Sequence, residues 1–300
     1  MPSLIDIKKK IKATKNTRKI TKAMQLVSAS KMRGFQKKAV HSRTYVWDLL
    51  EVLRENMKES LDSPLTEQRT SGKILFVLYT SDKGLCGALN SRILKTLVQS
   101  DLWKNTPEKD RLLMTIGKKS YDFARYRNIP VAKSFQSLNE KMTLLDSLDI
   151  VDEIIKYWEH HKVKQVVMIA PHYKNSLVYY PVMKTYLPFS EKMVEQHVRV
   201  EEMAEGKKVK EDVFEKEPPI IFEPSKARFS GVLVEQLVYT LFMQAFFELK
   251  AAEYSSRMIA MQNATDSAGD IIDKQTLKFN KLRQAAITQE IAEIVGGTMA

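Results

Sequence analysis

The two ends of this 300-residue chain are long segments without an internal proline, and they constrain the fold most strongly. From about residue 3 to 60, and again from 226 to 295, apolar residues recur in steps of three and four, which predicts amphipathic helices. At 1.5 Å per residue, these helices would be roughly 85 and 105 Å long. They are too long to be buried inside a compact domain. We therefore expect them to pack against each other as an antiparallel coiled coil.

The apolar rows define the expected seam between these helices. In the first segment they include Ile7, Ile20, Met24, Val27, Phe35 and Ala39; in the second they include Leu233, Leu237, Leu241, Phe246, Leu249 and Ala252.

Polar residues interrupt the rows of the second segment, namely Asn263, Thr265, Asn280, Arg283, Gln284 and Thr288. Arg283 and Gln284 are adjacent, so they point about 100° apart and cannot share one narrow seam. Thr288 follows Gln284 by four residues and lies on the same face. We interpret these polar residues as an outward face that meets a second partner. The pair Gly296-Gly297 is expected to end the coil.

The middle of the chain has a different pattern, with short apolar runs alternating with helical periods. Extended segments are predicted at 73–80, 111–117, 163–171 and 176–188, and helices at 88–100, 118–128 and 142–161. This alternation favours a mostly parallel sheet covered by helices. Pro181 indicates an edge position for the last run, because proline cannot donate to a sheet ladder.

These segments give the predicted organisation. The N-terminal coiled-coil helix covers 1–60, the central domain 73–225 and the C-terminal coiled-coil helix 226–300, with 201–218 as a charged insertion or linker. The fold class is therefore α/β plus a long coiled coil, with a Rossmann-like domain beside the base of the coil.

Positive charge is concentrated in the first helix. Residues 1–45 hold 13 Lys and Arg against the single acid Asp6, so this segment accounts for the whole net charge of +12. The interpretation without a functional role is a solvated helix face. The functional one is a surface for an acidic partner, which includes nucleic acid, anionic lipid and acidic protein segments.

Composition excludes several classes. No stretch approaches 18 uncharged apolar residues, so we expect no membrane span or direct membrane insertion. The N-terminal residues have charges but no apolar core, and we predict neither a signal nor a transit peptide. A single cysteine, Cys86, excludes an internal disulfide or a cysteine-cluster metal site, and fits a reducing cytoplasm.

No segment predicts catalysis. Residues 81–90, SDKGLCGALN, join a strand to a helix but lack the spacing of a phosphate-binding loop. We interpret the glycines as turn residues and Cys86 as a buried or idle thiol. His160, His161 and His172 do not suggest a metal site, and Asp149, Asp152 and Glu153 fit a solvated helix face. We expect no catalytic, cofactor or metal residues.

Three stretches together resemble one family. Residues 11–36, 80–90 and 255–297 are similar to the gamma subunit of bacterial-type F-type ATP synthases, in the same order and at the same ends. The resemblance implies a rotor shaft, which couples ion-driven rotation of a membrane ring to ATP synthesis or hydrolysis at beta subunits. The shaft itself is not catalytic. The lone Cys86 rules out the dithiol regulation of plant chloroplast homologues, and the absence of a presequence favours a bacterial source.

The resemblance also implies partners and contact residues. The partners are the ring of alpha and beta subunits, the epsilon subunit and the membrane c-ring, at the cytoplasmic face of the bacterial inner membrane, without a cofactor. Lys22 and Met24 would face the acidic lever loop of beta. The other implied contacts with the head are Arg257, Arg283, Gln284, Thr288 and Glu290.

Two alternatives remain open from the residues alone. One is a basic coiled-coil protein that binds nucleic acid, although residues 1–34 lack the aromatic side chains on which bases stack. The other is a nucleotide-binding α/β enzyme with helical extensions. Salt-dependent affinity for DNA would favour the first, and a nucleotide bound to the isolated chain would favour the second.

Overall fold

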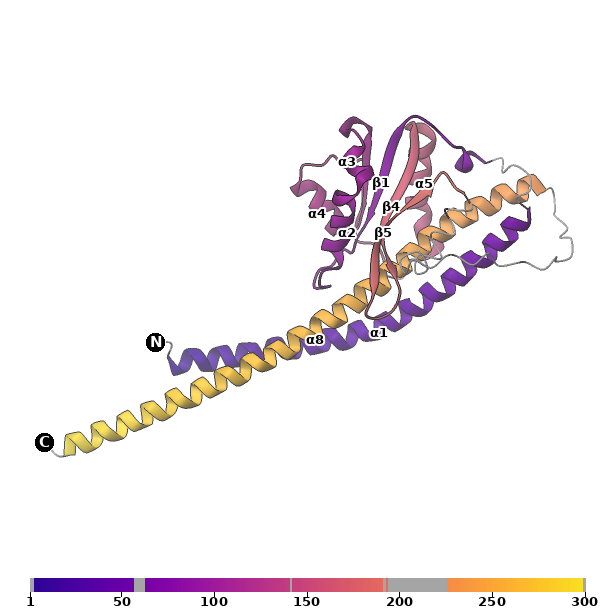
Figure 1. Cartoon of the computed structure of the whole chain (residues 1–300). Helices are drawn as coiled ribbons and strands as arrows, with labels where there is room; N and C mark the ends of the chain where they lie inside the picture. The colour runs from indigo at the N-terminus through magenta and orange to yellow at the C-terminus, as the bar shows by residue number, and fades with distance from the viewer. Residues whose placement is uncertain (1–2, 57–62, 141, 191–192, 194–225, 299–300) are drawn as a thin grey trace. The chain divides into compact units, whose positions relative to one another are not determined.

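The computed structural model describes residues 3–56, 63–140, 142–190, 193 and 226–298 (Figure 1). The chain forms two compact units. Unit 1 combines residues 1–30 with 257–300, and unit 2 spans 31–256. Each terminal helix therefore contributes to both units. The predicted charged insertion at 201–218 lies outside the described residues.

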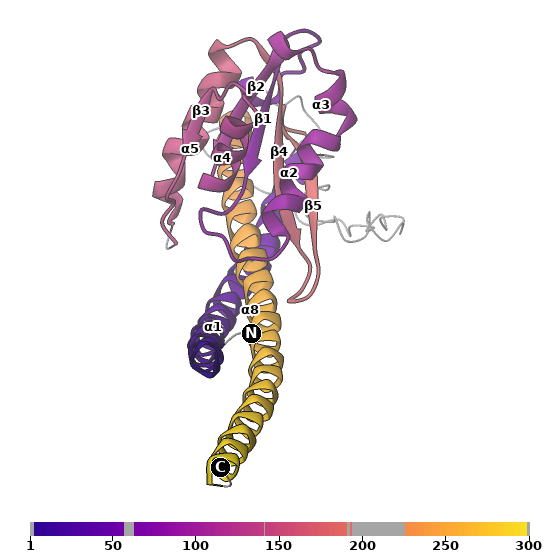
Figure 2. The same ribbon diagram turned by 90° about the vertical axis from the view of Figure 1, so that its left-hand side faces the viewer.

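Unit 2 contains a five-stranded sheet in the order β3-β2-β1-β4-β5 (Figure 2). The strands are β1 (Lys73–Tyr79), β2 (Arg111–Ile116), β3 (Lys133–Phe135), β4 (Val163–Tyr173) and β5 (Tyr179–Leu187). All neighbours are parallel except β4 and β5, which confirms the mostly parallel sheet. Pro181 lies in the edge strand β5, as predicted. The sequence did not predict β3, because three residues carry too little pattern.

Helices cover both faces of this sheet. They are α2 (Leu89–Gln99), α3 (Asp101–Asn105), α4 (Lys118–Tyr126) and α5 (Leu144–His160), with short 3-10 turns η1 (Pro64–Thr66) and η2 (Glu108–Asp110). In Figure 1, α2, α3 and α4 lie on one side of the sheet, and α5 lies on the other with part of α8. Alternate side chains of β1 serve the two sides: the Phe76 ring meets Trp103 of α3, and the Tyr79 ring stacks on Phe242 of α8.

Helices α1 (Leu4–Asn56) and α8 (Lys226–Thr298) are both continuous, as their proline-free patterns predict. Within unit 2 they run antiparallel, since Lys31 contacts Tyr254 while Arg43, farther along α1, contacts Glu248. The Phe35 ring stacks on Tyr254 at 5.7 Å between ring centroids. Apolar and aromatic side chains therefore form this part of the seam.

Within unit 1 the helices are again antiparallel, but polar side chains meet across the seam. Thr21 contacts Thr265, and Gln25 contacts Gln262. Thr265 is only 5% exposed, so its assignment to the outward face was wrong. Ile20 and Val27 are 61% and 56% exposed, so their place in the seam was also wrong.

The angle between neighbouring residues on a helix explains why Ile20 and Val27 lie outside the seam. Buried Thr21 and Ser28 are seven residues apart and lie in one seam. Ile20 and Val27 each precede one of these residues and are turned away from it by about 100°.

Helix α8 includes Gly296 and Gly297 and continues to Thr298, so the two glycines do not interrupt the helix, and their place at the end of the paired coil stays a prediction. Glycine ends a helix most readily when it takes a left-handed conformation just past the last turn. Gly297 is not among the positive-φ glycines, so it adds only the ordinary cost of helical glycine, about 1 kcal/mol relative to alanine.

One window of 18 residues within Arg228–Val295 is long and apolar enough to resemble a membrane span, with a mean hydropathy of 1.3. However, 67% of that window is buried inside the chain. The packing of α8 against the sheet and α1 accounts for its apolar character.

Candidate functional site

A cationic groove runs between α1 and α8 in unit 1, with a volume of about 710 Å³. Its charged lining residues are Lys15, Arg18, Lys19, Lys22 and Asp266. The four cations stand at relative positions 0, 3, 4 and 7 of α1, so the helix places all of them along one side. With four cations against one carboxylate, the groove suits an acidic partner.

Apolar side chains lie in and beside this groove. Ala23, Leu26 and Ile272 line it, and Leu26 is exposed to solvent. The nearby Ile20 and Val27 are exposed as well. A partner that matches the surface must therefore offer both negative charge and apolar contact.

The Arg18 side chain lies over Gly269 of α8 beside the groove. A side-chain carbon added there would lie 3.6 Å from the guanidinium carbon of Arg18. The guanidinium thus covers the backbone of α8, and its charge stays at the groove.

The structure separates the two predicted contact residues of α1. Lys22 is exposed and lines the groove, whereas Met24 is half-buried and is not among the groove's lining residues. The Met24 carbonyl accepts a hydrogen bond from Ser28 Oγ at 2.7 Å. The groove instead brings Lys22 together with Lys15, Arg18 and Lys19.

Four of the five predicted contact residues of α8 are exposed near its end. They are Arg283, Gln284, Thr288 and Glu290. Thr288 Oγ1 donates to the Gln284 carbonyl at 2.9 Å, so its hydroxyl is partly occupied by its own helix. Arg257 differs, because only 6% of it is exposed. The partner contact of all seven residues stays a prediction, and for Arg257 it must be weighed against a packing role.

One apolar stripe was missed by the sequence reasoning. Ile287, Ile291 and Ile294 follow one another at steps of four and three on α8, and all three are exposed. Their spacing was readable as one helix face.

The start of α4, a type of position that binds anions in many proteins, is occupied here by the chain's own carboxylate. After β1, Asp82 Oδ1 accepts from the N–H groups of Lys118 at 2.9 Å and Ser137 at 3.0 Å, and Oδ2 accepts from Leu138 at 3.2 Å. A carboxylate thus sits at the start of α4, where an anionic ligand would otherwise bind.

The other candidate residues also have structural surroundings. Cys86 is buried, as predicted, and Asn90 Nδ2 lies 3.2 Å from its sulfur. In the turn before α2, the left-handed residues are Leu85 and Gly87, so only one of the two GLCG glycines has the expected conformation. Among the described residues, no group of three His, Cys, Asp or Glu side chains could hold a metal ion.

The acidic side chains of α5 are not a uniformly solvated face. Asp149 is exposed, but half-buried Asp152 accepts a hydrogen bond from Tyr239 of α8. Half-buried Glu153 lies 3.6 Å from the ammonium of Lys133. Two of the three residues therefore join α5 to its neighbours.

Glu140 joins the loop after β3 to both long helices within unit 2. Its carboxylate pairs with Lys31 of α1 and accepts from the hydroxyl of Tyr254 on α8, with Lys83 at 4.0 Å. Partial burial opposes ionisation, but the hydrogen bonds from Lys31 and Tyr254 and the nearby cations outweigh it and lower the pKa of Glu140 to about 2. The carboxylate therefore stays charged at any ordinary pH.

Comparisons with known proteins agree over the whole chain. Residues 3–300 match the family described as ATP synthase. An ATP synthase gamma chain of Pelotomaculum thermopropionicum is 36% identical over 302 residues, covering 100% of this chain and 99% of the relative. That of Symbiobacterium thermophilum is 34% identical over 299 residues, covering 98% and 96%.

Solved structures share the fold. A chain of the Tetrahymena thermophila mitochondrial ATP synthase, from its central stalk and c-ring, aligns with a TM-score of 0.57 and 24% identity over 82% of this chain and 99% of that chain. A chain of the Euglena gracilis mitochondrial ATP synthase rotor aligns with a TM-score of 0.58 and 16% identity over 95% and 98%. The full-length match in sequence, with the paired terminal helices and the mixed sheet, shows that this chain belongs to the family of ATP synthase gamma chains.

Proposed function

We propose that the cationic groove of unit 1, with the apolar side chains beside it, is the surface on which this gamma chain engages the alpha and beta subunits. As a gamma chain, the protein is the central-stalk rotor of an F-type ATP synthase, whose catalysis resides in the beta subunits. The observation that carries the proposal is the alignment of Lys15, Arg18, Lys19 and Lys22 beside exposed Leu26.

The chemistry of this surface fits a contact that must form and break repeatedly. Exposed ion pairs contribute only about 0.2–1 kcal/mol each. Several of them can hold an acidic loop of the beta subunit in place without fixing the shaft at one position. Exposed side chains such as Arg283 and Gln284 add further polar contacts of the same reversible kind.

The long helices suit the mechanical load. Each elementary charge that crosses 100 mV supplies about 2.3 kcal/mol. Several charges per step therefore approach the total of about 5–15 kcal/mol that keeps a domain folded. Helices paired along a buried seam can carry such a load without unfolding locally, whereas an irregular connection would yield first.

The other partners follow from the same role. We place the epsilon subunit and the membrane c-ring on unit 2, and the complex at the cytoplasmic face of a bacterial inner membrane. Support comes from the Tetrahymena chain, which belongs to a central stalk with its c-ring, and from the bacterial relatives. The full-length match to gamma chains decides against the nucleic-acid alternative.

Substitution of Met24 tests the predicted contact of this residue with the beta subunit, separately from the groove, which Met24 does not line. In the assembled enzyme, Met24→Lys adds a cation beside the lever of beta and should reduce proton pumping per ATP hydrolysed, with little effect on assembly. Met24→Leu is the matched control, because it keeps the side chain apolar and close in volume. Unchanged pumping per ATP in Met24→Lys would remove Met24 from the contact.

The end of α8 is tested separately. Replacing Arg283 and Gln284 by alanine should lower ATP turnover of the whole complex, and Thr288→Ala and Glu290→Ala extend the test along the helix. Lys278→Ala is the control, since Lys278 is also exposed and points about 140° away from Arg283 and about 120° away from Gln284. If turnover fell equally in the control, a general loss of charge and not a specific contact would be responsible.

A further inference from the structure

A single buried carboxylate connects three elements of unit 2. Glu248 of α8 is 3% exposed, and its oxygens are surrounded by donors. Arg43 Nε of α1 donates to Oε1 at 2.8 Å, and the Tyr173 N–H of β4 donates to Oε2 at 3.3 Å. His172 Nδ1, also on β4, lies 2.8 Å from Oε2.

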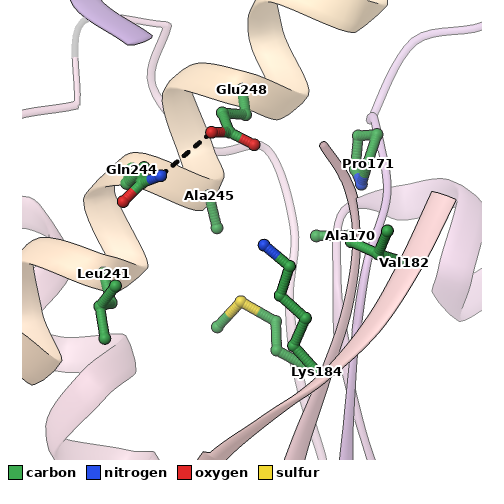
Figure 3. Close-up of a pocket in the computed structure, with 9 residues that line it drawn as sticks. Ala170, Pro171, Val182, Lys184, Leu241, Gln244, Ala245 and Glu248 are labelled. Carbon is green, nitrogen blue, oxygen red and sulfur yellow. Dashed lines mark hydrogen bonds between the residues drawn. The ribbon is translucent and has the colours of Figure 1, made fainter. Parts of the chain in front are cut away.

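The remaining contacts fix the orientation of this cluster. Gln244 Nε2, one turn earlier on α8, donates to Glu248 Oε1 at 3.1 Å (Figure 3). Arg43 Nη2 also donates to the Tyr173 carbonyl, so one guanidinium holds α8 and β4 at the same time. Arginine can do this because its planar fork presents several donors in fixed directions.

β5 also lies near this carboxylate. Lys184 extends from β5 toward α8 in Figure 3, beside a cavity of about 20 Å³ that it lines with Gln244 and Glu248. A cavity of this size holds about one water molecule. The hydrogen bonds that hold the carboxylate come from β4, from α1 and from α8 itself.

Two other contacts between the sheet and α8 involve neutral groups. The Tyr79 ring stacks on Phe242 at 5.6 Å between centroids, and the Tyr186 hydroxyl donates to the Val238 carbonyl. The hydrophobic burial of the rings is non-directional, so it specifies the position of α8 less tightly than hydrogen bonds to a buried carboxylate do. A carboxylate held by donors from two other elements has one favourable position, and moving it exposes an unpaired buried charge.

We infer that Glu248, held by Arg43 and the end of β4, is the joint that transmits torque between the sheet and both long helices of unit 2. Glu248 and Arg43 are positioning residues in this role and do not touch the reacting nucleotide. The inference rests on the proposed rotor function. It goes beyond that function because it concerns contacts inside this chain and not its contacts with the alpha and beta subunits.

The test uses the assembled ATP synthase carrying Glu248→Gln. We expect ATP hydrolysis to stay within about twofold of the parent, while protons pumped per ATP fall about fivefold, a change of the size that a mutation can make in coupling. Lys250→Gln is the matched control: it breaks another buried ion pair, with Glu253 at 3.2 Å, but one that lies within α8. Pumping per ATP should be unchanged in this control.

A milder variant covers the case in which Glu248→Gln does not assemble. Arg43→Lys keeps the charge, but one ammonium cannot hold both the carboxylate and the Tyr173 carbonyl in the same fork. It should give a smaller loss of pumping per ATP with full assembly. Normal coupling in both variants, or an equal loss in Lys250→Gln, would overturn the inference.

A double variant separates the joint from simple charge balance. The loss of pumping per ATP in Glu248→Gln could come only from the charge of Arg43, left without its carboxylate. In that case the double variant Arg43→Gln/Glu248→Gln would restore coupling, and this result would overturn the proposed role of Glu248. Persistent loss supports it. The proposed contact with the alpha and beta subunits is tested independently of this inference, since Met24→Lys could leave coupling intact while Glu248→Gln impairs it.

Discussion

The side-chain oxygens of Thr21 and Thr265 lie 2.8 Å apart in a buried contact that joins α1 to α8 within unit 1. Each hydroxyl is also near a carbonyl of its own helix: Thr21 Oγ1 is 3.1 Å from Arg18 O, and Thr265 Oγ1 is 2.7 Å from Met261 O. Because a hydroxyl has one proton, one threonine donates across the seam and the other donates along its own helix.

This arrangement predicts non-additive substitutions. Thr21→Val or Thr265→Val alone should lower the free energy of unfolding by about 1 kcal/mol, the net value of a hydrogen bond. The double variant should cost no more than either single one, because the bond is already lost. Urea unfolding of the full chain measures all three, and fully additive losses would show that the two hydroxyls do not depend on each other.

Two glycines should respond in opposite directions to alanine. At Gly34 in α1, an added Cβ meets nothing within 4 Å, so Gly34→Ala should stabilise the chain by about 0.5–1 kcal/mol. At Gly117, φ is +91° and the added Cβ would lie 2.1 Å from the Thr80 carbonyl oxygen, so Gly117→Ala should strongly destabilise it. Thermal unfolding compares them, and a lower midpoint for Gly34→Ala would contradict the prediction.

Arg257 should behave as a packed residue. Because its side chain is buried, Arg257→Ala should reduce the free energy of unfolding by about 1–3 kcal/mol. The exposed Arg283 is the control, and Arg283→Ala should change the free energy of unfolding by less than about 0.5 kcal/mol. Denaturant titration of both variants measures the two changes in unfolding free energy. If Arg257→Ala changed ATP turnover but not stability, partner contact would be its main role.

Lys184 should make stability depend on pH in the alkaline range. Burial lowers the pKa of Lys184 to about 8, helped by the Arg43 charge and opposed by Glu248. The unfolded lysine has an ordinary pKa of about 10.4. Between these values the unfolded state binds more protons than the native one, so the lysine's contribution to stability rises with pH. Below pH 8 the charged ammonium is held at a cost of at most about 3 kcal/mol.

Lys184→Met should therefore raise the free energy of unfolding at pH 7. It should also remove the lysine's share of the increase in unfolding free energy between pH 8 and 10. The control is Lys95→Met, which changes an exposed lysine of α2. Unfolding free energies measured at pH 7, 8, 9 and 10 give the two slopes. Parallel slopes for the parent chain and Lys184→Met would show that Lys184 does not titrate in this range.

The sequence predicted the long helices and most strands because those features depend on local period and on proline. It placed Ile20 and Val27 in the wrong position because a period gives the spacing of residues on a helix, but not the angle at which that helix meets its partner. It also could not show the burial of Arg257.

The cluster around Glu248 was not predictable for a different reason. His172 and Glu248 are far apart in the chain, and only the pairing of β4 with α8 brings them within 2.8 Å. Nothing in the local pattern around Glu248 distinguishes it from an exposed acid of a helix. The same holds for Asp82, whose three N–H partners come from later parts of the chain.

The unbroken course of α1 restricts its length as well as its composition. Lys31 and Arg43 lie on one helix, and each meets its own partner on α8 within unit 2. Inserting or deleting one residue between them would turn one contact relative to the other by about 100° and shift it by about 1.5 Å. No loop lies between them to absorb the change. Many of the intervening side chains can be exchanged, but the number of residues that separates the two contacts cannot.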